Sequence, residues 1–271
     1  MTMHWRPVYA VLQREVVRMA RQRTRLVSAM VRPLIWLFVI GAGFGAVLQQ
    51  ANGISYQQFL VPGVLGMTML FGAMLAALTM VYDKESGVMR MLIIAPFPHY
   101  WIVVAKWLSA ALAALLQALL LLVLLVVLGY LDAQTRIGLL ALALLATSAA
   151  CAGIGILVAA FTRTLDNFAA IMNFVIFPVF FLSGSLYPVG RLPIALKTVA
   201  LVNPYTYGVD LLKHAVTGEL ASGMGADFAI STDIAVLVGF TLAALLVASW
   251  RFSRESAYEP MIRLLTGKRD G

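Results

Sequence analysis

Residues 101–130, WIVVAKWLSAALAALLQALLLLVLLVVLGY, decide the fold class of this chain. The stretch has one charged residue, Lys106, close to its start. A helix needs ~20 mainly apolar residues to cross the hydrocarbon of a bilayer, and this stretch exceeds that length. Five further apolar runs lie at 33–49, 58–82, 137–161, 168–183 and 232–250. The sequence therefore predicts an all-α integral membrane protein with six transmembrane helices.

The charged residues support this class and predict an orientation. Only 12% of the chain is charged and 62% is apolar, and the charged share is about half that of an average soluble domain. With six crossings, the two termini and the loops 83–100 and 162–167 lie on the same side of the membrane. That side holds 16 of the 20 Lys and Arg residues. Such a bias sets orientation during insertion, so we expect both termini to be cytoplasmic. The same topology accounts for the net charge of +8 better than a soluble, nucleic-acid-binding protein does.

The segments that flank the spans divide the chain into three parts. Residues 1–32 are expected to form a cytoplasmic amphipathic helix, residues 33–252 the transmembrane domain, and residues 253–271 a cytoplasmic tail. In the first part, one ridge of arginines faces the headgroups and an apolar stripe faces the bilayer, as in an interfacial helix. The helix is either a general anchor or a lever that joins the first span to a cytoplasmic partner. The ridge consists of Arg14, Arg18, Arg21 and Arg25.

The region 184–216 is expected to form a re-entrant helical hairpin before the last span. Its apolar pieces are too short to cross, and Asn203-Pro204-Tyr205-Thr206-Tyr207 interrupts them. Irregular backbone at membrane depth must be buried in protein or face water. We therefore predict two short helices joined at 202–205. An amphipathic loop lying on the outer surface is the alternative.

The loop 83–100 between the second and third spans carries an apolar strip on the cytoplasmic side. Charged residues come first, and Val88, Met91, Leu92 and Ala95 then follow at helical spacing before Pro96. An apolar face in this position needs a partner to bury it. The loop is therefore a candidate docking element.

This loop resembles the coupling loop of ABC-2 type (type-2 exporter) ABC transporter permeases. The order of the basic interfacial helix, the six spans, the re-entrant hairpin and the Asn-Pro-x-x-Tyr-like element is similar to that family over about residues 5–253. Bacterial lipo-oligosaccharide and drug exporters look most similar. The resemblance implies a homodimer with two ATPase subunits in the bacterial cytoplasmic (inner) membrane. It also implies export of a lipid-linked saccharide, a lipo-oligosaccharide or a hydrophobic drug.

The resemblance also assigns candidate site residues. In the coupling loop, Glu85 would be the acidic contact, Gly87 the turn, and residues 90–95 the docking ridge, with Arg90, Met91, Leu92, Ala95 and then Pro96. Alternatively, Glu85 is a solvated charge paired with Lys84 or Arg90. A substrate path between the first, second and fifth spans would be lined by Trp36, Phe44, Phe71, Asn173, Phe174, Phe177 and Phe181. The re-entrant element would use Asn203, Pro204, Tyr205 and Tyr207.

Several chemistries are not expected of this chain itself. It has no G-x-x-x-x-G-K-[ST] segment, so ATP and Mg²⁺ are expected in a partner ATPase subunit. No set of catalytic residues is recognisable, which disfavours an enzyme. His4, His99 and His214 are far apart in the sequence, and no metal site is expected from them. No ionisable residue lies in the middle of a predicted span, which disfavours a proton- or sodium-coupled carrier. The alternatives to an ABC exporter permease are a secondary transporter, a channel or a non-transporting scaffold subunit.

Overall fold

The fold is given by a computed structural model that describes residues 9, 12–14, 17, 31, 33–43, 56–89, 98, 100–131, 135–216 and 225–265. These residues contain helices and no strand, which confirms the predicted all-α class. The elements are η1 (Trp36–Ile40), α4 (Tyr56–Glu85), α6 (Tyr100–Val127), α7 (Ile137–Phe161), α8 (Leu165–Phe181), η2 (Val189–Arg191), α9 (Ile194–Val202), α10 (Pro204–Val216) and α11 (Ile230–Leu265).

Four of the described helices are long and apolar enough to cross a membrane. They are α4, α6, α7 and the part of α11 from Ile230 to Arg254. Two shorter apolar helices, Pro33–Gly43 and Leu165–Phe181, coincide with the first and fifth predicted spans. The first of these includes the π-helix η1. The count of six crossings therefore stays a prediction.

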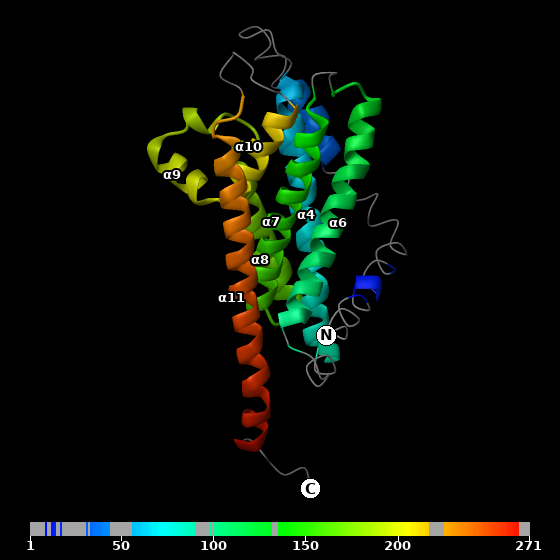
Figure 1. The fold of residues 1–271 in the computed structure, drawn as a ribbon, viewed down its shortest axis with the longest axis vertical. Coiled ribbons are helices and arrows are strands. Elements are labelled where there is room, and N and C mark those ends of the chain that lie inside the picture. The colour runs from blue at the N-terminus through cyan, green and yellow to red at the C-terminus, as the bar shows by residue number, and fades with distance from the viewer. Residues whose placement is uncertain are drawn as a thin grey trace.

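The long helices run up and down one bundle (Figure 1). The Glu85 end of α4 and the Phe161 end of α7 lie together at one end of the bundle, and α11 extends well past that end. Helices α9 and α10 lie at the other end. The short helix α8 connects these two ends. Its first residue, Leu165, bonds to Glu85, and Val179 near its last turn bonds to Asn203 beside α10.

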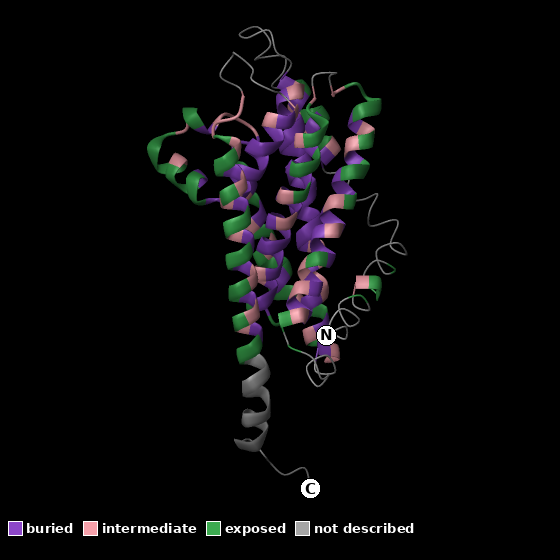
Figure 2. Ribbon diagram, viewed as in Figure 1, coloured by how far each residue is buried: buried purple, intermediate pink, exposed green. Residues whose placement is uncertain are grey.

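Helix α4 forms the centre of the bundle and contacts α6, α7, α8, α10 and η1. Most of its residues are buried, whereas α11 shows a continuous exposed face (Figure 2). Close packing around α4 depends on its small residues. At Gly66, an added Cβ would lie 2.5 Å from the hydroxyl of Tyr205, so only glycine allows α10 to approach α4 this closely. Exposed apolar side chains such as Leu246 and Val123 cover the outside, as expected where lipid replaces water.

A few described basic residues mark the two ends. Lys84 bonds to the end of α7, whereas Lys213 belongs to α10 and the backbone N–H of Arg136 donates to the carbonyl of Ala215 in α10. The partition of Lys and Arg across a membrane stays a prediction. The last helix differs from the predicted boundary, because α11 continues beyond Trp250 to Leu265. Loss of apolar character marks where a span leaves the hydrocarbon, but it does not require the helix to end. The tail predicted from residue 253 therefore begins as helix.

Candidate functional site

The Glu85 end of α4 is fixed by a buried ionic contact. Asp83 is 2% exposed. Its Oδ2 lies 2.5 Å from the ammonium of Lys106 on α6 and 2.8 Å from the guanidinium of Arg14. Removing one partner of such a buried group leaves a charge without compensation, which is strongly unfavourable. Asp83 thereby joins α4, α6 and the predicted interfacial helix at one point.

The next two residues bind the turn between α7 and α8. The ammonium of Lys84 donates to the carbonyls of Ala159 and Ala160, both at 3.0 Å, at the end of α7. The carboxylate of Glu85 accepts the backbone N–H of Leu165, the first residue of α8, at 2.9 Å. The free carbonyls at the end of a helix attract a cation, and the free N–H groups at its start attract an anion. Opposite charges on neighbouring residues therefore hold the two sides of one turn.

Helix α4 ends in the turn that the sequence predicts. Gly87 has a φ of +77°, the left-handed conformation in which helices commonly end and which glycine adopts without strain. Val88 and Met89 then resume a helical conformation, and Met89 is buried. The remaining predicted coupling residues lie outside the described part of the chain, so the docking ridge stays a prediction. They are Arg90, Met91, Leu92, Ala95 and Pro96, together with Arg18, Arg21 and Arg25 of the arginine ridge.

Helix α8 has one packed face and one exposed face. The packed face includes Phe168, Ile176 and Phe180, all buried. Part of the predicted substrate path lies on the exposed face, where Phe174 is 80% exposed. We call this face the α8 strip; it consists of Asn173, Phe174, Phe177 and Phe181.

The structure brings only some of the predicted path residues together. Trp36 meets Phe181 edge-to-face, with ring centroids 5.7 Å apart, and Phe177 stacks on Phe181 at 6.3 Å. Phe71 instead lies buried within the core on α4. Phe44 falls outside the described residues. The candidate path is therefore best represented by Trp36 and the α8 strip.

The predicted re-entrant element forms two short helices, α9 and α10, which meet at Asn203. The side-chain oxygen of Asn203 accepts the backbone N–H of Tyr205 at 3.1 Å, and Pro204 occupies the first helical position. This arrangement is a typical N-cap. The Asn203 amide N–H also donates to the carbonyl of Val179 in α8 at 2.7 Å. The joint at 202–205 is as predicted, and its depth in a bilayer stays a prediction.

Two tyrosines strengthen this joint in different ways. The hydroxyl of Tyr207 donates to the carbonyl of Leu201 at 2.8 Å, across the α9–α10 joint. The ring of Tyr205 is 1% exposed and packs against α4. The Asn-Pro-x-x-Tyr-like element therefore connects α4, α8, α9 and α10.

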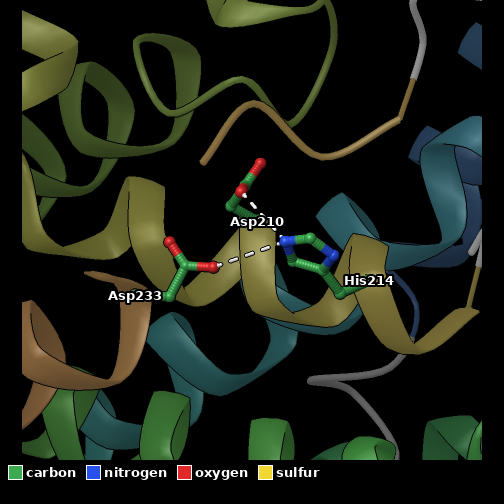
Figure 3. Close-up of side chains that lie close together, drawn as sticks. All are labelled: Asp210, His214 and Asp233. Atoms are coloured by element: carbon green, nitrogen blue, oxygen red, sulfur yellow. Dashed lines mark ion pairs between the residues drawn. The ribbon is translucent and has the colours of Figure 1, made fainter. Parts of the chain in front are cut away.

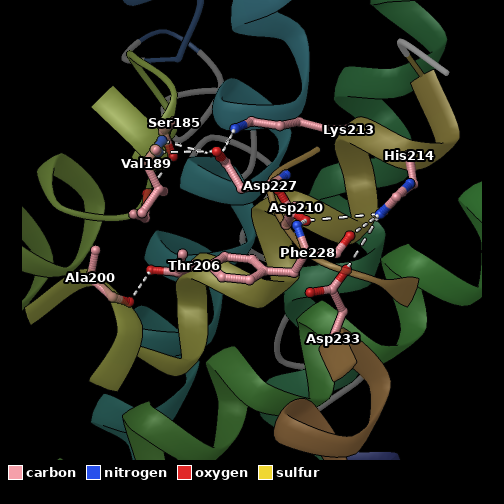
Figure 4. Close-up of polar contacts among 12 residues, drawn as sticks. Ser185, Val189, Ala200, Thr206, Asp210, Lys213, His214, Asp227, Phe228 and Asp233 are labelled. Carbon is pink, nitrogen blue, oxygen red and sulfur yellow. Dashed lines mark hydrogen bonds and ion pairs between the residues drawn. The ribbon is translucent and has the colours of Figure 1, made fainter. Parts of the chain in front are cut away.

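A polar cluster at the same end was not anticipated from the sequence (Figure 4). The carboxylate of Asp227 accepts the backbone N–H groups of Val189 and Gly190, both at 3.1 Å, and lies 3.5 Å from the ammonium of Lys213. The carboxylate of Asp210 accepts the N–H groups of Asp227 and Phe228 at 2.8 and 2.9 Å. Burial raises the pKa of the Asp210 carboxyl, and these two N–H groups partly oppose the shift.

A signal for this cluster existed in the sequence. Asp210, Lys213 and His214 are spaced at i, i+3 and i+4, which places them on neighbouring positions of a helix surface. Their partners Asp227 and Asp233 lie on later segments. The spacing of residues along one helix cannot predict contacts with residues of another segment.

The chain is similar in sequence to a known family of membrane proteins. Residues 6–216 match the family model described as ABC-2 type transporter. The chain belongs to the ABC-2 type transporter family. It is 28% identical over 190 residues to Nodulation protein J of Rhizobium leguminosarum bv. viciae, covering 69% of this chain and 73% of that protein. It is 24% identical over 250 residues to Inner membrane transport permease YadH of Escherichia coli (strain K12), covering 91% of this chain and 94% of that protein.

The contacts described above therefore belong to an ABC-2 transport permease. Permeases of this family generally work with ABC ATPase partners. The matched range includes the Glu85 end of α4, the α8 strip and the Asn203 joint. It ends before the segment of Asp227 and Phe228 and before α11, so the polar cluster lies partly outside it.

Proposed function

We propose that this ABC-2 permease is the membrane subunit of an ATP-driven exporter. It moves a hydrophobic or amphipathic substrate out of the cytoplasm or the inner leaflet. The substrate class is a lipid-linked saccharide, a lipo-oligosaccharide or a drug. The observation that carries the proposal is the hydrogen bond from the backbone N–H of Leu165 to Glu85. This bond joins the start of the docking loop to the helix that presents the α8 strip.

The bond supports a route by which a partner's movement reaches the substrate path. Glu85 precedes the turn at Gly87, and the expected docking strip for an ATPase follows, formed by Val88, Met91, Leu92 and Ala95. Helix α8 begins at the atom that Glu85 binds and carries Phe174 and Phe177 on its exposed face. A displacement of the loop would be transmitted to α8 through Glu85 and, through Lys84, to the end of α7.

The α8 strip supports a path at the contact between two copies of the chain. Phe174, Phe177 and Phe181 are exposed, uncharged and aromatic, and Asn173 adds one amide. Such a lining suits an acyl chain or a flat apolar molecule, while the amide can hydrogen-bond to a polar group of the substrate. A homodimer with Trp36 and the α8 strip facing the second copy would enclose the path.

The source of energy and the orientation complete the proposal. The sequence has no P-loop, so ATP and Mg²⁺ would be bound by two copies of a separate ATPase subunit. The partition of Lys and Arg supports six spans in the bacterial inner membrane with cytoplasmic termini. The polar interruption at Asn203 supports a re-entrant hairpin formed by α9 and α10.

The test is the ATPase activity of the permease–ATPase complex in nanodiscs, with and without added lipo-oligosaccharide. In the wild-type complex we expect substrate to stimulate ATP hydrolysis. Glu85→Ala removes the acceptor for the Leu165 N–H, so the complex should still assemble but lose most of the stimulation. Glu85→Gln is the matched control because its side-chain oxygen can still accept that N–H.

Two results would contradict the proposal. If substrate stimulated ATP hydrolysis in Glu85→Ala as strongly as in the wild type, the hydrogen bond between Glu85 and Leu165 would not be needed for coupling. Substrate movement in permease-only vesicles, driven by an ion gradient without any ATPase, would instead indicate a secondary transporter.

A further inference from the structure

Three potential metal ligands meet between α10 and α11, at the end opposite to Glu85 (Figure 3). Asp210 and His214 are four residues apart on α10, so their side chains share one face of that helix. Asp233 belongs to the first turn of α11. The His214 Nε2 lies 3.9 Å from an Oδ2 atom of each aspartate, and one ligand atom from each residue lies within 4.8 Å of the others.

Asp233 is the informative member of this group. Its side chain is fully buried at 0% exposure, and neither carboxylate oxygen has a hydrogen-bond partner within the described structure. Figure 3 shows this carboxylate directed at the imidazole of His214. Burying an ionised carboxylate without hydrogen bonds is costly, and proteins avoid this cost by protonating the carboxylate, by pairing it with a cation or by binding a metal ion.

Lys213, the lysine on α10, points to Asp227 and not to Asp233. The ammonium of Lys213 lies 3.5 Å from Asp227 and 5.4 Å from the ring centre of Phe59. Figure 4 shows it pointing to Asp227, on the side of α10 away from Asp233. Two buried carboxylates therefore lie near a single imidazole. If both are ionised, one more cation would balance their charge.

The backbone adds a carbonyl oxygen to the group. The carbonyl of Phe228 accepts a hydrogen bond from the His214 Nε2 at 2.8 Å, so a bound metal ion would have to replace the proton on this nitrogen. The N–H groups of Asp227 and Phe228 donate to the two carboxylate oxygens of Asp210 and fix its orientation. Outer hydrogen bonds of this kind orient metal ligands in proteins. The side chain of His214 is 17% exposed, which leaves a route from solvent.

We propose that Asp210, His214 and Asp233 bind one divalent cation of the Zn²⁺ type, with the carbonyl of Phe228 as fourth ligand. An imidazole with carboxylates favours such ions over Mg²⁺ or Ca²⁺. Bonds of ~2.0–2.2 Å to a tetrahedral ion separate the ligand atoms by ~3.4 Å. The observed 3.9 Å contacts would therefore need to shorten by about half an ångström, and the 2.8 Å contact between His214 Nε2 and the Phe228 carbonyl would need to lengthen by about as much. The bound ion would fasten α10 to α11.

From the sequence, no metal site was expected of the three histidines, because they lie far apart in the chain. In the structure His214 lies near aspartates from two helices, α10 and α11. This site does not depend on the export proposal, because its ligands lie apart from Glu85 and the α8 strip.

The test is zinc binding by the purified full-length chain in detergent after treatment with EDTA. We expect one Zn²⁺ per chain by elemental analysis, saturable binding by calorimetry, and a rise in the thermal unfolding temperature on addition of ZnCl₂. Asp233→Asn and His214→Gln should each weaken binding by more than ~100-fold, because loss of outer-shell partners alone typically costs 10–100-fold. His99→Gln, which removes a histidine that is not one of the proposed ligands, should bind as the wild type does.

A further variant, in which one metal ligand is replaced by another, distinguishes loss of the site from loss of folding. Asp233→His replaces one ligand by another and should retain zinc binding with an added imidazole signature in the zinc X-ray absorption spectrum. The proposal is overturned if the wild type shows no saturable zinc binding, or if Asp233→Asn and His214→Gln bind zinc as tightly as His99→Gln. It is also overturned if Asp233→Asn raises the unfolding temperature of the metal-free chain while zinc leaves the wild type unchanged. In that case a proton, and not a metal ion, neutralises Asp233.

Discussion

Asp83 shows how one buried charge can organise the end of a membrane bundle. Its Oδ2 contacts Lys106 at 2.5 Å and Arg14 at 2.8 Å, so a single carboxylate holds two cations from different parts of the chain. Transfer of the three charges from water is unfavourable, and their mutual attraction and hydrogen bonds offset that cost. Such a contact adds little net stability while it is intact, but it strongly penalises the loss of one member.

Replacement of Lys106 by an apolar residue tests this view. Lys106→Met should lower the free energy of unfolding in detergent by about 3–5 kcal/mol, because Asp83 stays buried without its shortest ion pair. The double variant Asp83→Asn/Lys106→Met removes both charges and should recover a large part of that loss. Lys197→Met, at the opposite end, should change stability by no more than about 0.5 kcal/mol. Equal losses in Lys106→Met and the double variant would show that the ion pair is not the source of the effect.

At the scale of elements, the sequence predicts the apolar helices well and the contacts between them poorly. Residues 58–82 and 101–130 were predicted as spans, and α4 and α6 cover most of both. The α9–α10 joint was also predictable, because Asn203 and Pro204 form a local N-cap and start signal. In contrast, the bond between Glu85 and Leu165 joins residues far apart in the chain. Hydrophobic periodicity contains no information on such pairs.

The same limit applies to close helix approach. A glycine in an apolar helix suggests small-residue packing, yet the sequence does not name the neighbour. The structure does: Gly66 of α4 receives the hydroxyl end of Tyr205 of α10.

Gly66→Ala should therefore loosen the contact between α4 and α10. The new Cβ would lie 2.5 Å from the Tyr205 hydroxyl oxygen and 3.1 Å from its ring carbon Cζ, and overpacking of this kind costs about 1–3 kcal/mol. Thermal unfolding in detergent would measure the loss, and Tyr205→Phe in the same chain should restore part of it. Gly239→Ala is the matched control, since nothing lies within 4 Å of that position. A Gly66→Ala variant as stable as the control would contradict this packing.

At the scale of the whole molecule, the two ends of the bundle differ in kind. The Glu85 end fixes α4 to α6, α7 and α8 through three successive charged residues and leads into the predicted docking strip. The opposite end combines the Asn203 joint with the aspartate cluster. Helix α8 extends between the ends and exposes the aromatic residues of the α8 strip along its second half. This polarity suits a permease that receives force at one end and releases substrate at the other.

The central claim is that an ATPase docks on the strip of Val88, Met91, Leu92 and Ala95, and co-purification tests it most directly. The tagged permease should retain a P-loop ATPase when it is purified from its own cells. Leu92→Asp should lose that partner, because burial of an unpaired charge costs at least several kcal/mol, whereas Leu92→Met should keep it. Retention of the ATPase at wild-type levels by a folded Leu92→Asp variant would contradict the account.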